Sequence, residues 1–157
     1  MKIKLLCLTL ALLLLAPALA RADQKTGVPN PLQPPVKGLT FIKFDEAIKQ
    51  ATEENKLLML FFWAETCGWC TKIRQDVFEN EKVREPFEKS FVAVSVDIAR
   101  DPERISEQFK PKALPTMAFM RPDGEVLGLL PGYIDLDTFT EIIKFISEEA
   151  LKKPADK

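Results

Sequence analysis

Two cysteines three residues apart, in Cys67-Gly68-Trp69-Cys70, are the residues whose types and spacing most favour chemistry. Two thiols at this spacing can form and open a disulfide bond reversibly, and the attacking species is the thiolate. A helix that begins at Cys67 would stabilise its thiolate, because a helix N-terminus carries unpaired N–H groups and a partial positive charge. We therefore predict that Cys67 is the nucleophile and that Cys70, one turn further on, is the more buried, resolving cysteine.

Hydrophobic spacing predicts the elements that position this pair. Residues 44–55 carry apolar side chains at a helical spacing, and residues 57–63 form a continuous apolar run, as in a strand buried on both faces. Residues 67–78 are expected to form one helix, and residues 91–97 a second buried strand. The cysteines therefore lie where a buried strand gives way to a helix.

Two short elements are expected in the middle of the chain. Asn80 is predicted to cap a short turn that Pro86 must end or bend. Asp101-Pro102 has the sequence of a helix start, and this helix is expected to run to about Phe109.

The last part of the chain is predicted to form a hairpin and a helix. Residues 116–120 and 125–130 flank residues 121–124, whose proline and glycine suit a tight turn. Asp135 or Asp137 is expected to begin a long amphipathic helix. Strands separated by helices, followed by a hairpin and a closing helix, indicate an α/β fold in which helices flank a mixed central β-sheet.

The first 20 residues have the features of a cleavable export signal. Lys2 and Lys4 precede an apolar stretch that is too short to span a bilayer comfortably, and small residues follow it. Cleavage is predicted after Ala20 or Ala22. We therefore expect a periplasmic or secreted protein.

Export affects how the cysteines are interpreted. The predicted segments are, in order, a signal peptide at 1–20, a Pro-rich linker at 21–38, a folded domain at 39–153 and a tail at 154–157. Cleavage would remove Cys7 and leave Cys67 and Cys70 as the only cysteines in an oxidising compartment. A disulfide between such near neighbours closes a tiny loop and removes little unfolded-state entropy, so a purely structural role explains the pair poorly.

Charge and composition argue against a nucleic-acid partner. The chain has 22 basic and 23 acidic residues, and loss of Lys2 and Lys4 would leave a net charge of −3. No basic patch or stripe of aromatic and arginine residues is present in the sequence. We expect a monomer with no metal and no cofactor other than the redox-active Cys67–Cys70 disulfide.

Residues 63–70 resemble the active-site segment of the thioredoxin-like superfamily, and Leu114-Pro115-Thr116 resembles its cis-proline element. Residues 77–83 and 132–135 resemble, more particularly, the periplasmic C-terminal thioredoxin-like domain of the transmembrane thiol:disulfide interchange reductase. The similarity spans about residues 40–147 and implies a thioredoxin-like fold.

The resemblance also implies which residues support the cysteines. It implies that the Leu114–Pro115 peptide bond is cis and faces the pair, so that the backbone of Leu114 can pair with an extended substrate segment. Thr116 belongs to the same element. Gly68 and Trp69 lie between the cysteines, where Trp69 offers an apolar surface for substrate.

Three departures from the thioredoxin pattern remove acid–base groups. Phe61 stands where thioredoxins carry a buried acid, Ala93 or Val94 stands where they carry a lysine, and the chain contains no histidine. Proton transfer to Cys70 would then rely on water, on Glu65 or on another acid. Glu65 is alternatively a solvated surface residue.

The function predicted from these features is that of an exported thiol–disulfide oxidoreductase. Trp69 adds no charge, so the helix N-terminus is the main influence on the Cys67 thiolate, which favours a reducing or isomerising pair over a dedicated oxidant. Its substrates would be thiols and disulfides of other proteins, and its reductant a membrane-embedded electron donor.

Two other functions use parts of the same pattern. Two thiolates together with Met117 or Met120 could hold Cu(I), which prefers soft ligands, in a copper carrier. A non-catalytic binding protein or chaperone could have the same fold, although both cysteines of the pair are intact here.

Overall fold

The computed structural model describes residues 38–101 and 103–152. The predicted signal peptide, residues 21–37 of the predicted linker and the predicted tail lie outside this part of the chain. The elements are, in order, β1 (Phe41–Ile42), α1 (Phe44–Glu54), β2 (Leu57–Trp63), α2 (Gly68–Ile73), the π-helix η1 (Arg74–Phe78), α3 (Glu81–Ser90), β3 (Phe91–Asp97), α4 (Ile105–Phe109), β4 (Thr116–Met120), β5 (Val126–Pro131) and α5 (Leu136–Lys152).

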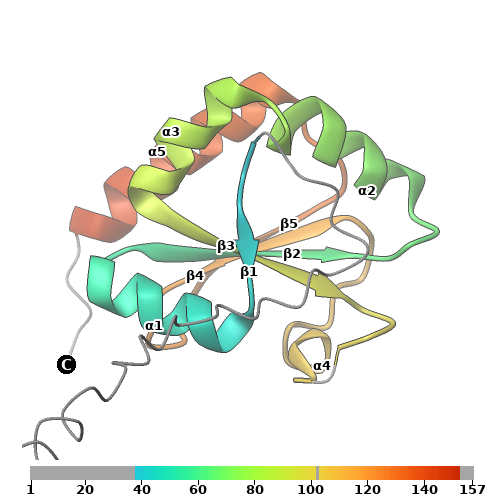
Figure 1. Cartoon of the computed structure of the whole chain (residues 1–157), viewed down its shortest axis with the longest axis horizontal. Helices are drawn as coiled ribbons and strands as arrows, with labels where there is room; N and C mark the ends of the chain where they lie inside the picture. The colour runs from blue at the N-terminus through green and yellow to red at the C-terminus, as the bar shows by residue number, and fades with distance from the viewer. Residues whose placement is uncertain (1–37, 102, 153–157) are drawn as a thin grey trace, which may run out of the picture. The chain divides into compact units, whose positions relative to one another are not determined.

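The strands form one mixed sheet in the order β1-β3-β2-β4-β5 (Figure 1). β3 pairs in parallel with both β1 and β2. β4 pairs antiparallel with both β2 and β5, which confirms the predicted hairpin. The predicted α/β fold with a mixed central sheet is therefore confirmed.

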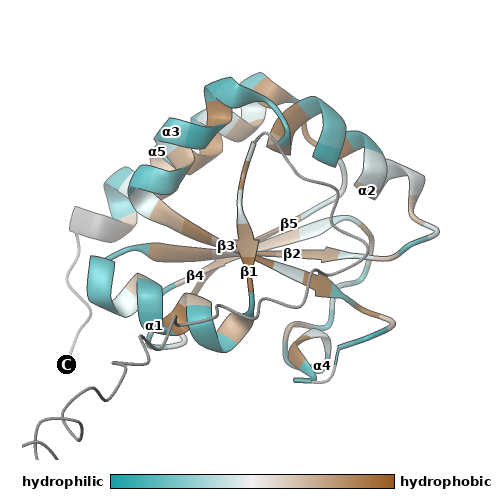
Figure 2. Cartoon of the chain, in the orientation of Figure 1, coloured by the Kyte–Doolittle hydropathy of each residue, from teal (hydrophilic) through white to brown (hydrophobic). Residues whose placement is uncertain are grey.

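Helices cover both faces of this sheet. α2, η1, α3 and α5 lie on one face, and α1 and α4 lie on the other (Figure 1). Alternate side chains of β2 enter the two cores, with Phe61 in the first and Phe62 in the second. Figure 2 shows the consequence, since the central strands are hydrophobic and the helices turn hydrophilic surface outward. Burial on both faces explains why β2 is apolar at every position.

Residues 67–78 do not form the single α-helix that was predicted. α2 ends at Ile73, and the chain continues as η1, in which the Glu79 N–H donates a hydrogen bond to the Arg74 carbonyl, five residues earlier. The side chains of Arg74 and Glu79 pair across this wider turn at 3.6 Å. Apolar spacing did not reveal the change because the π-helical segment still directs Phe78 into the core.

Two further predictions are corrected by the structure. The segment after Asn80 is not a short turn, because α3 continues to Ser90 and Pro86 does not end it. Val83 and Phe87 are buried on either side of the proline. The helix predicted from Asp101 begins only at Ile105. The N-cap residue of α4 is Arg104, and the Asp101 carboxylate accepts a hydrogen bond from the backbone N–H of Ser106 in the first turn.

The start of the last helix is decided by Asp135. Its carboxylate accepts a hydrogen bond from the Thr138 N–H at 2.9 Å, and α5 begins at Leu136. That backbone hydrogen bond holds the pKa of Asp135 below its ordinary value. No helix within the described residues, α5 included, has both the length and the apolarity needed to cross a membrane.

Candidate active site

The two cysteines lie at the beginning of α2, with Cys67 at the end of the loop that follows β2 and Cys70 in the first turn of the helix. Cys67 is the N-cap residue, in an extended conformation with φ −86° and ψ 97°. Its Sγ accepts a hydrogen bond from the backbone N–H of Cys70 at 3.1 Å. This is the contact that stabilises negative charge at a helix N-terminus, and the structure gives it to the cysteine predicted to attack.

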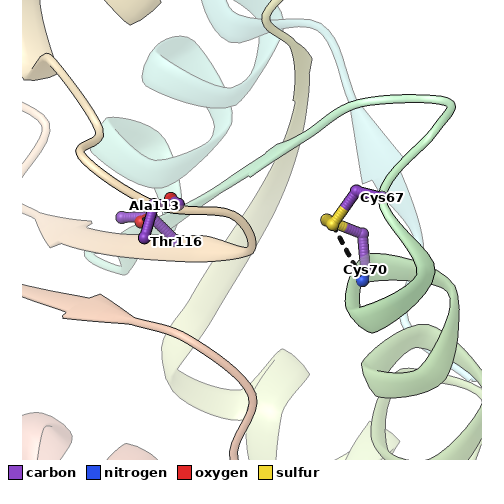
Figure 3. Close-up of a disulfide and its surroundings, with 4 residues drawn as sticks. All are labelled: Cys67, Cys70, Ala113 and Thr116. Atoms are coloured by element: carbon purple, nitrogen blue, oxygen red, sulfur yellow. Dashed lines mark hydrogen bonds between the residues drawn. A yellow bond between two sulfur atoms is a disulfide. The ribbon is translucent and has the colours of Figure 1, made fainter.

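The sulfurs of Cys67 and Cys70 are joined in a disulfide with an S–S distance of 2.04 Å (Figure 3). Their surroundings differ. Cys67 is half-buried, whereas Cys70 is 4% exposed and belongs to the core on the α5 face of the sheet. Cys67 is therefore the more exposed residue of the pair, and Cys70 the more buried one.

The Leu114–Pro115 peptide bond is cis, as the resemblance implied. The Thr116 hydroxyl donates a hydrogen bond to the Ala113 carbonyl at 2.7 Å and so closes the turn around this bond. Thr116 is itself buried, and Leu114 packs against both cores. Figure 3 shows this turn among the surroundings of the disulfide.

The sheet brings the cis-proline turn and the cysteines to the same end of its central strands, β2 and β4. Thr116, the first residue of β4, is paired with Phe62 near the end of β2. Because β2 and β4 are antiparallel, the turn before β4 and the loop after β2 leave the sheet at the same end. Cys70 and Pro115, which are 45 positions apart in the sequence, thus lie at the same end of the sheet.

The structure adds Lys72, Asp76 and Tyr133 to the surroundings of Trp69, and the sequence did not single out these three residues as a group. Trp69 is 59% exposed, and the centroid of its ring lies 5.6 Å from that of Tyr133. The Tyr133 hydroxyl donates a hydrogen bond to Asp76 Oδ2 at 2.9 Å, and Lys72 Nζ contacts the same oxygen at 2.6 Å. The ammonium of Lys72 also lies 5.3 Å from the centre of the Tyr133 ring.

This group shifts the titration of its own members. Hydrogen bonds, first from Lys72 and then from Tyr133, hold the pKa of Asp76 below its ordinary value. The hydrogen bond to Asp76 raises the pKa of Lys72 and also that of Tyr133. Trp69 and Lys72 lie in α2 and Asp76 lies in η1. Their spacing of three and then four residues would put them on one side of the single helix predicted over residues 67–78, and this spacing was the available sequence signal.

Glu65, the predicted proton-transfer candidate, is an exposed residue on the loop after β2. Its carboxylate lies 3.6 Å from the guanidinium of Arg100, and both side chains are about two-thirds exposed. Gly68 is also exposed, and a β-carbon built on it meets no atom within 4 Å.

The two methionines considered as copper ligands are both buried in β4. Met117 belongs to the core that contains Cys70, whereas Met120 belongs to the core on the opposite face of the sheet. Only Met117 therefore shares a face with the cysteine pair. No group of three or more potential histidine, cysteine or carboxylate ligands lies together in the described ranges 38–101 and 103–152.

Three features define a protein of the thioredoxin fold with a Cys-x-x-Cys pair. They are a mixed sheet, a disulfide at a helix N-terminus, and a cis-proline turn at the same end of the sheet as the disulfide. The chain belongs to the thioredoxin-like domain family, which matches residues 44–147. Proteins with this fold are commonly disulfide oxidoreductases.

Among curated proteins, human Spermatogenesis-associated protein 20 is 34% identical to this chain over 58 residues. The match covers 37% of this chain and 7% of the length of the human protein. The likeness therefore concerns one segment of a much longer relative.

Solved structures with the same fold include bacterial thiol–disulfide proteins. A proposed disulphide-isomerase from Bacteroides thetaiotaomicron is 28% identical, with a TM-score of 0.61 over 72% of this chain and 95% of its own. A Thermus thermophilus thioredoxin gives 23% identity and a TM-score of 0.63, covering 69% and 87% of the two chains. The oxidised C-terminal domain of Neisseria meningitidis DsbD gives 21% identity and 0.52, covering 68% and 98%. The likenesses to the Thermus and Neisseria proteins, at 23% and 21% identity, show a shared fold.

Proposed function

We propose that this protein is an exported thiol–disulfide oxidoreductase that reduces or isomerises disulfides of other proteins through Cys67 and Cys70. The observation that carries the proposal is the unequal placement of the two sulfurs. Cys67 is half-buried and accepts the Cys70 N–H at 3.1 Å, whereas Cys70 is 4% exposed. A nucleophile needs access and a stabilised thiolate, and a resolving thiol needs only to reach the sulfur beside it.

The reaction proceeds in two exchanges. In the first, the Cys67 thiolate attacks one sulfur of a substrate disulfide, forms a mixed disulfide and releases the other substrate sulfur as a thiolate. In the second, Cys70 loses its proton and attacks Cys67 Sγ, which forms the Cys67–Cys70 disulfide and releases the remaining substrate thiolate. The substrate gains two electrons, and the pair loses them.

Repeated turnover requires a dithiol reductant that returns two electrons to the Cys67–Cys70 disulfide. We propose that a membrane-embedded electron donor supplies them, because the predicted signal peptide sends the protein out of the cytoplasm. Support for this part of the proposal comes from the sequence resemblance to a domain of a transmembrane reductase. Protein thiols and disulfides are the proposed substrates of a monomeric protein.

Trapping of mixed disulfides tests the assignment of the two cysteines. Cys70→Ala, reduced and mixed with oxidised insulin, should accumulate a covalent adduct at Cys67 that dithiothreitol releases. Cys67→Ala is the matched control and should form little adduct. Adducts that form equally on both variants, or on neither, would contradict the proposed roles.

The reduction potential tests the direction of electron flow. Equilibration of the pair with glutathione buffers should give a value nearer to the −270 mV of a reductase than to the −120 mV of a strong oxidant, both approximate reference values. A potential near the oxidising value would instead assign the protein to disulfide formation.

A further inference from the structure

We propose that Tyr133 and Trp69 form an aromatic shelf beside the dithiol that receives an apolar side chain flanking the substrate disulfide. We propose also that Tyr133 fixes the helical segment formed by α2 and η1 relative to the cis-proline turn. The inference rests on the proposed function and names the substrate class of the same site. Two independent sets of contacts carry it, one made by the backbone before α5 and one made by the side chains.

The backbone contact joins the loop before α5 to the cis-proline turn. The N–H of Gly132 donates a hydrogen bond to the Pro115 carbonyl at 2.7 Å. Gly132 has φ +90°, a conformation that residues with a β-carbon rarely adopt. The hydrogen bond to Pro115 is therefore made at a glycine, which can adopt that conformation. Tyr133 follows directly and is thereby placed next to the substrate-binding turn.

The side-chain contacts join the same loop to α2 and η1. The Tyr133 hydroxyl donates to Asp76, which lies 57 residues earlier in the chain, and its ring packs beside Trp69. Gly132 and Tyr133 therefore connect Pro115 on one side with Trp69 and Asp76 on the other. We assign Tyr133 as a positioning residue that sets the spacing between the dithiol and the turn facing it.

The chemistry of the exposed surface favours an apolar occupant. Trp69 is 59% exposed although it directly precedes the buried Cys70, so its indole is presented to solvent at the place where a substrate must arrive. Lys72 and Asp76 flank the shelf, and their contact at 2.6 Å pairs the positive charge with the negative one. A leucine or aromatic side chain next to a substrate cysteine suits such a surface better than a charged one.

A pair of oxidised peptides tests this preference. Each peptide contains two cysteines in a disulfide, flanked in one peptide by leucines and in the other by glycines. The full chain, reduced and freed of reductant, is mixed with each peptide, and the second-order rate constants are measured by chromatography of the peptide thiols. Partial burial of a leucine predicts that the leucine peptide reacts about fivefold faster with the wild type.

The variants divide the effect between the ring and the hydroxyl. Trp69→Ala and Tyr133→Ala should bring the ratio of the two rate constants close to one. Tyr133→Phe keeps the ring but loses the bond to Asp76, and it should leave a preference of about twofold. The matched control is Phe145→Ala, because Phe145 is an aromatic residue of α5 that is 67% exposed, and its removal should leave the ratio unchanged.

The outcomes separate this inference from the proposed function. If the wild type reduces hydroxyethyl disulfide and both peptides without preference, or if Trp69→Ala slows both peptides equally, the shelf is refuted and the oxidoreductase proposal stands. A full preference in Tyr133→Phe would refute the positioning role. Failure of the wild type to reduce any disulfide would refute the function and the inference together. Should Tyr133→Ala not fold, Trp69→Ala and Tyr133→Phe still decide the result.

Discussion

The ring of Phe61 lies edge-on against that of Phe78, with centroids 5.0 Å apart and planes at 85°. Phe61 stands where the thioredoxins that this sequence resembles carry a buried acid. Thr116 and Arg121 are the buried polar side chains in the part of the chain that the structure describes. No carboxylate is therefore buried beside Cys70 within that part, and we expect Cys70, the proposed resolving cysteine, to exchange its proton with water or with an exposed group.

Alkylation should distinguish the two thiols. In the reduced protein at pH 7, iodoacetamide is expected to modify Cys67 on the order of tenfold faster than Cys70, because Cys67 is accessible and accepts a backbone N–H. Peptide mapping by mass spectrometry after timed quenching measures both rates. The Cys67→Ala variant should react slowly, and preferential modification of Cys70 in the wild type would show that the assigned order is wrong.

Tyr133 offers a spectroscopic test because it is the single tyrosine of the sequence. Its phenolate absorbance should appear with a midpoint above the ordinary value of 10.0, because the hydrogen bond to Asp76 raises its pKa. Asp76→Asn should move the midpoint back toward that value, since the charged acceptor is lost. An unchanged midpoint in the variant would mean that Asp76 and Tyr133 do not interact in solution.

The same hydrogen bond gives a pH dependence of stability with a defined sign. The folded-state pKa of Tyr133 is raised, so its contribution is fully present below pH 10.0 and is lost as the pH rises through the raised value. The pKa of Asp76 is lowered, so its contribution is present above pH 3.8 and is lost as the pH falls through the lowered value. The difference in unfolding midpoint between the wild type and Tyr133→Phe should accordingly be largest between these limits.

The elements that could be predicted correctly from the sequence are the strands that helices cover on both faces of the sheet. Residues 57–63 and 91–97 form β2 and β3 with the predicted bounds, because a strand covered by helices on both sides must be apolar throughout. The position of Cys67 at a helix N-terminus follows from the same cause, since the buried strand β2 ends at Trp63 and α2 begins after a short loop, at Gly68.

The parts that the sequence did not predict depend on contacts between distant segments. The hydrogen bond from Tyr133 to Asp76 joins the loop between β5 and α5 to η1, 57 residues earlier in the chain, and no local pattern at Asp76 indicates it. The π-helical segment is similar, because its end packs against Gly38 and Leu39. The Leu39 N–H donates to the Phe78 carbonyl at 2.8 Å.

Gly38 should be intolerant of substitution for a reason of space. A β-carbon there would lie 1.5 Å from the Phe78 carbonyl oxygen and 2.7 Å from Glu79 Cα, both of which are backbone atoms that cannot rotate away. Gly38→Ala is therefore expected to lower the free energy of unfolding by about 3 kcal/mol, as measured by urea denaturation.

The matched control for that change is Gly68→Ala. Gly68 is the first residue of α2, and a β-carbon there has no neighbour within 4 Å. Alanine in an open helical position should raise the free energy of unfolding by up to about 1 kcal/mol. If the two variants were equally stable, the close approach of Gly38 to the end of η1 would not exist in solution.

Glu65 can be tested as the proton donor or acceptor for Cys70 by comparing it with an equivalent acid elsewhere. Glu65 and Glu107 are both exposed carboxylates paired with an arginine, Arg100 and Arg104 respectively. A positioned general acid or base contributes about 10²-fold or more to a rate. A carboxylate held in an exposed ion pair contributes little even to stability. The structure places Glu65 in the second situation, so Glu65→Gln should change the rate of mixed-disulfide resolution by less than about twofold, as should Glu107→Gln. Single-turnover stopped-flow measurements between pH 5 and 9 give this rate. A large loss of rate in Glu65→Gln alone, with a flattened pH profile, would show instead that Glu65 carries the proton that the missing buried acid carries in thioredoxins.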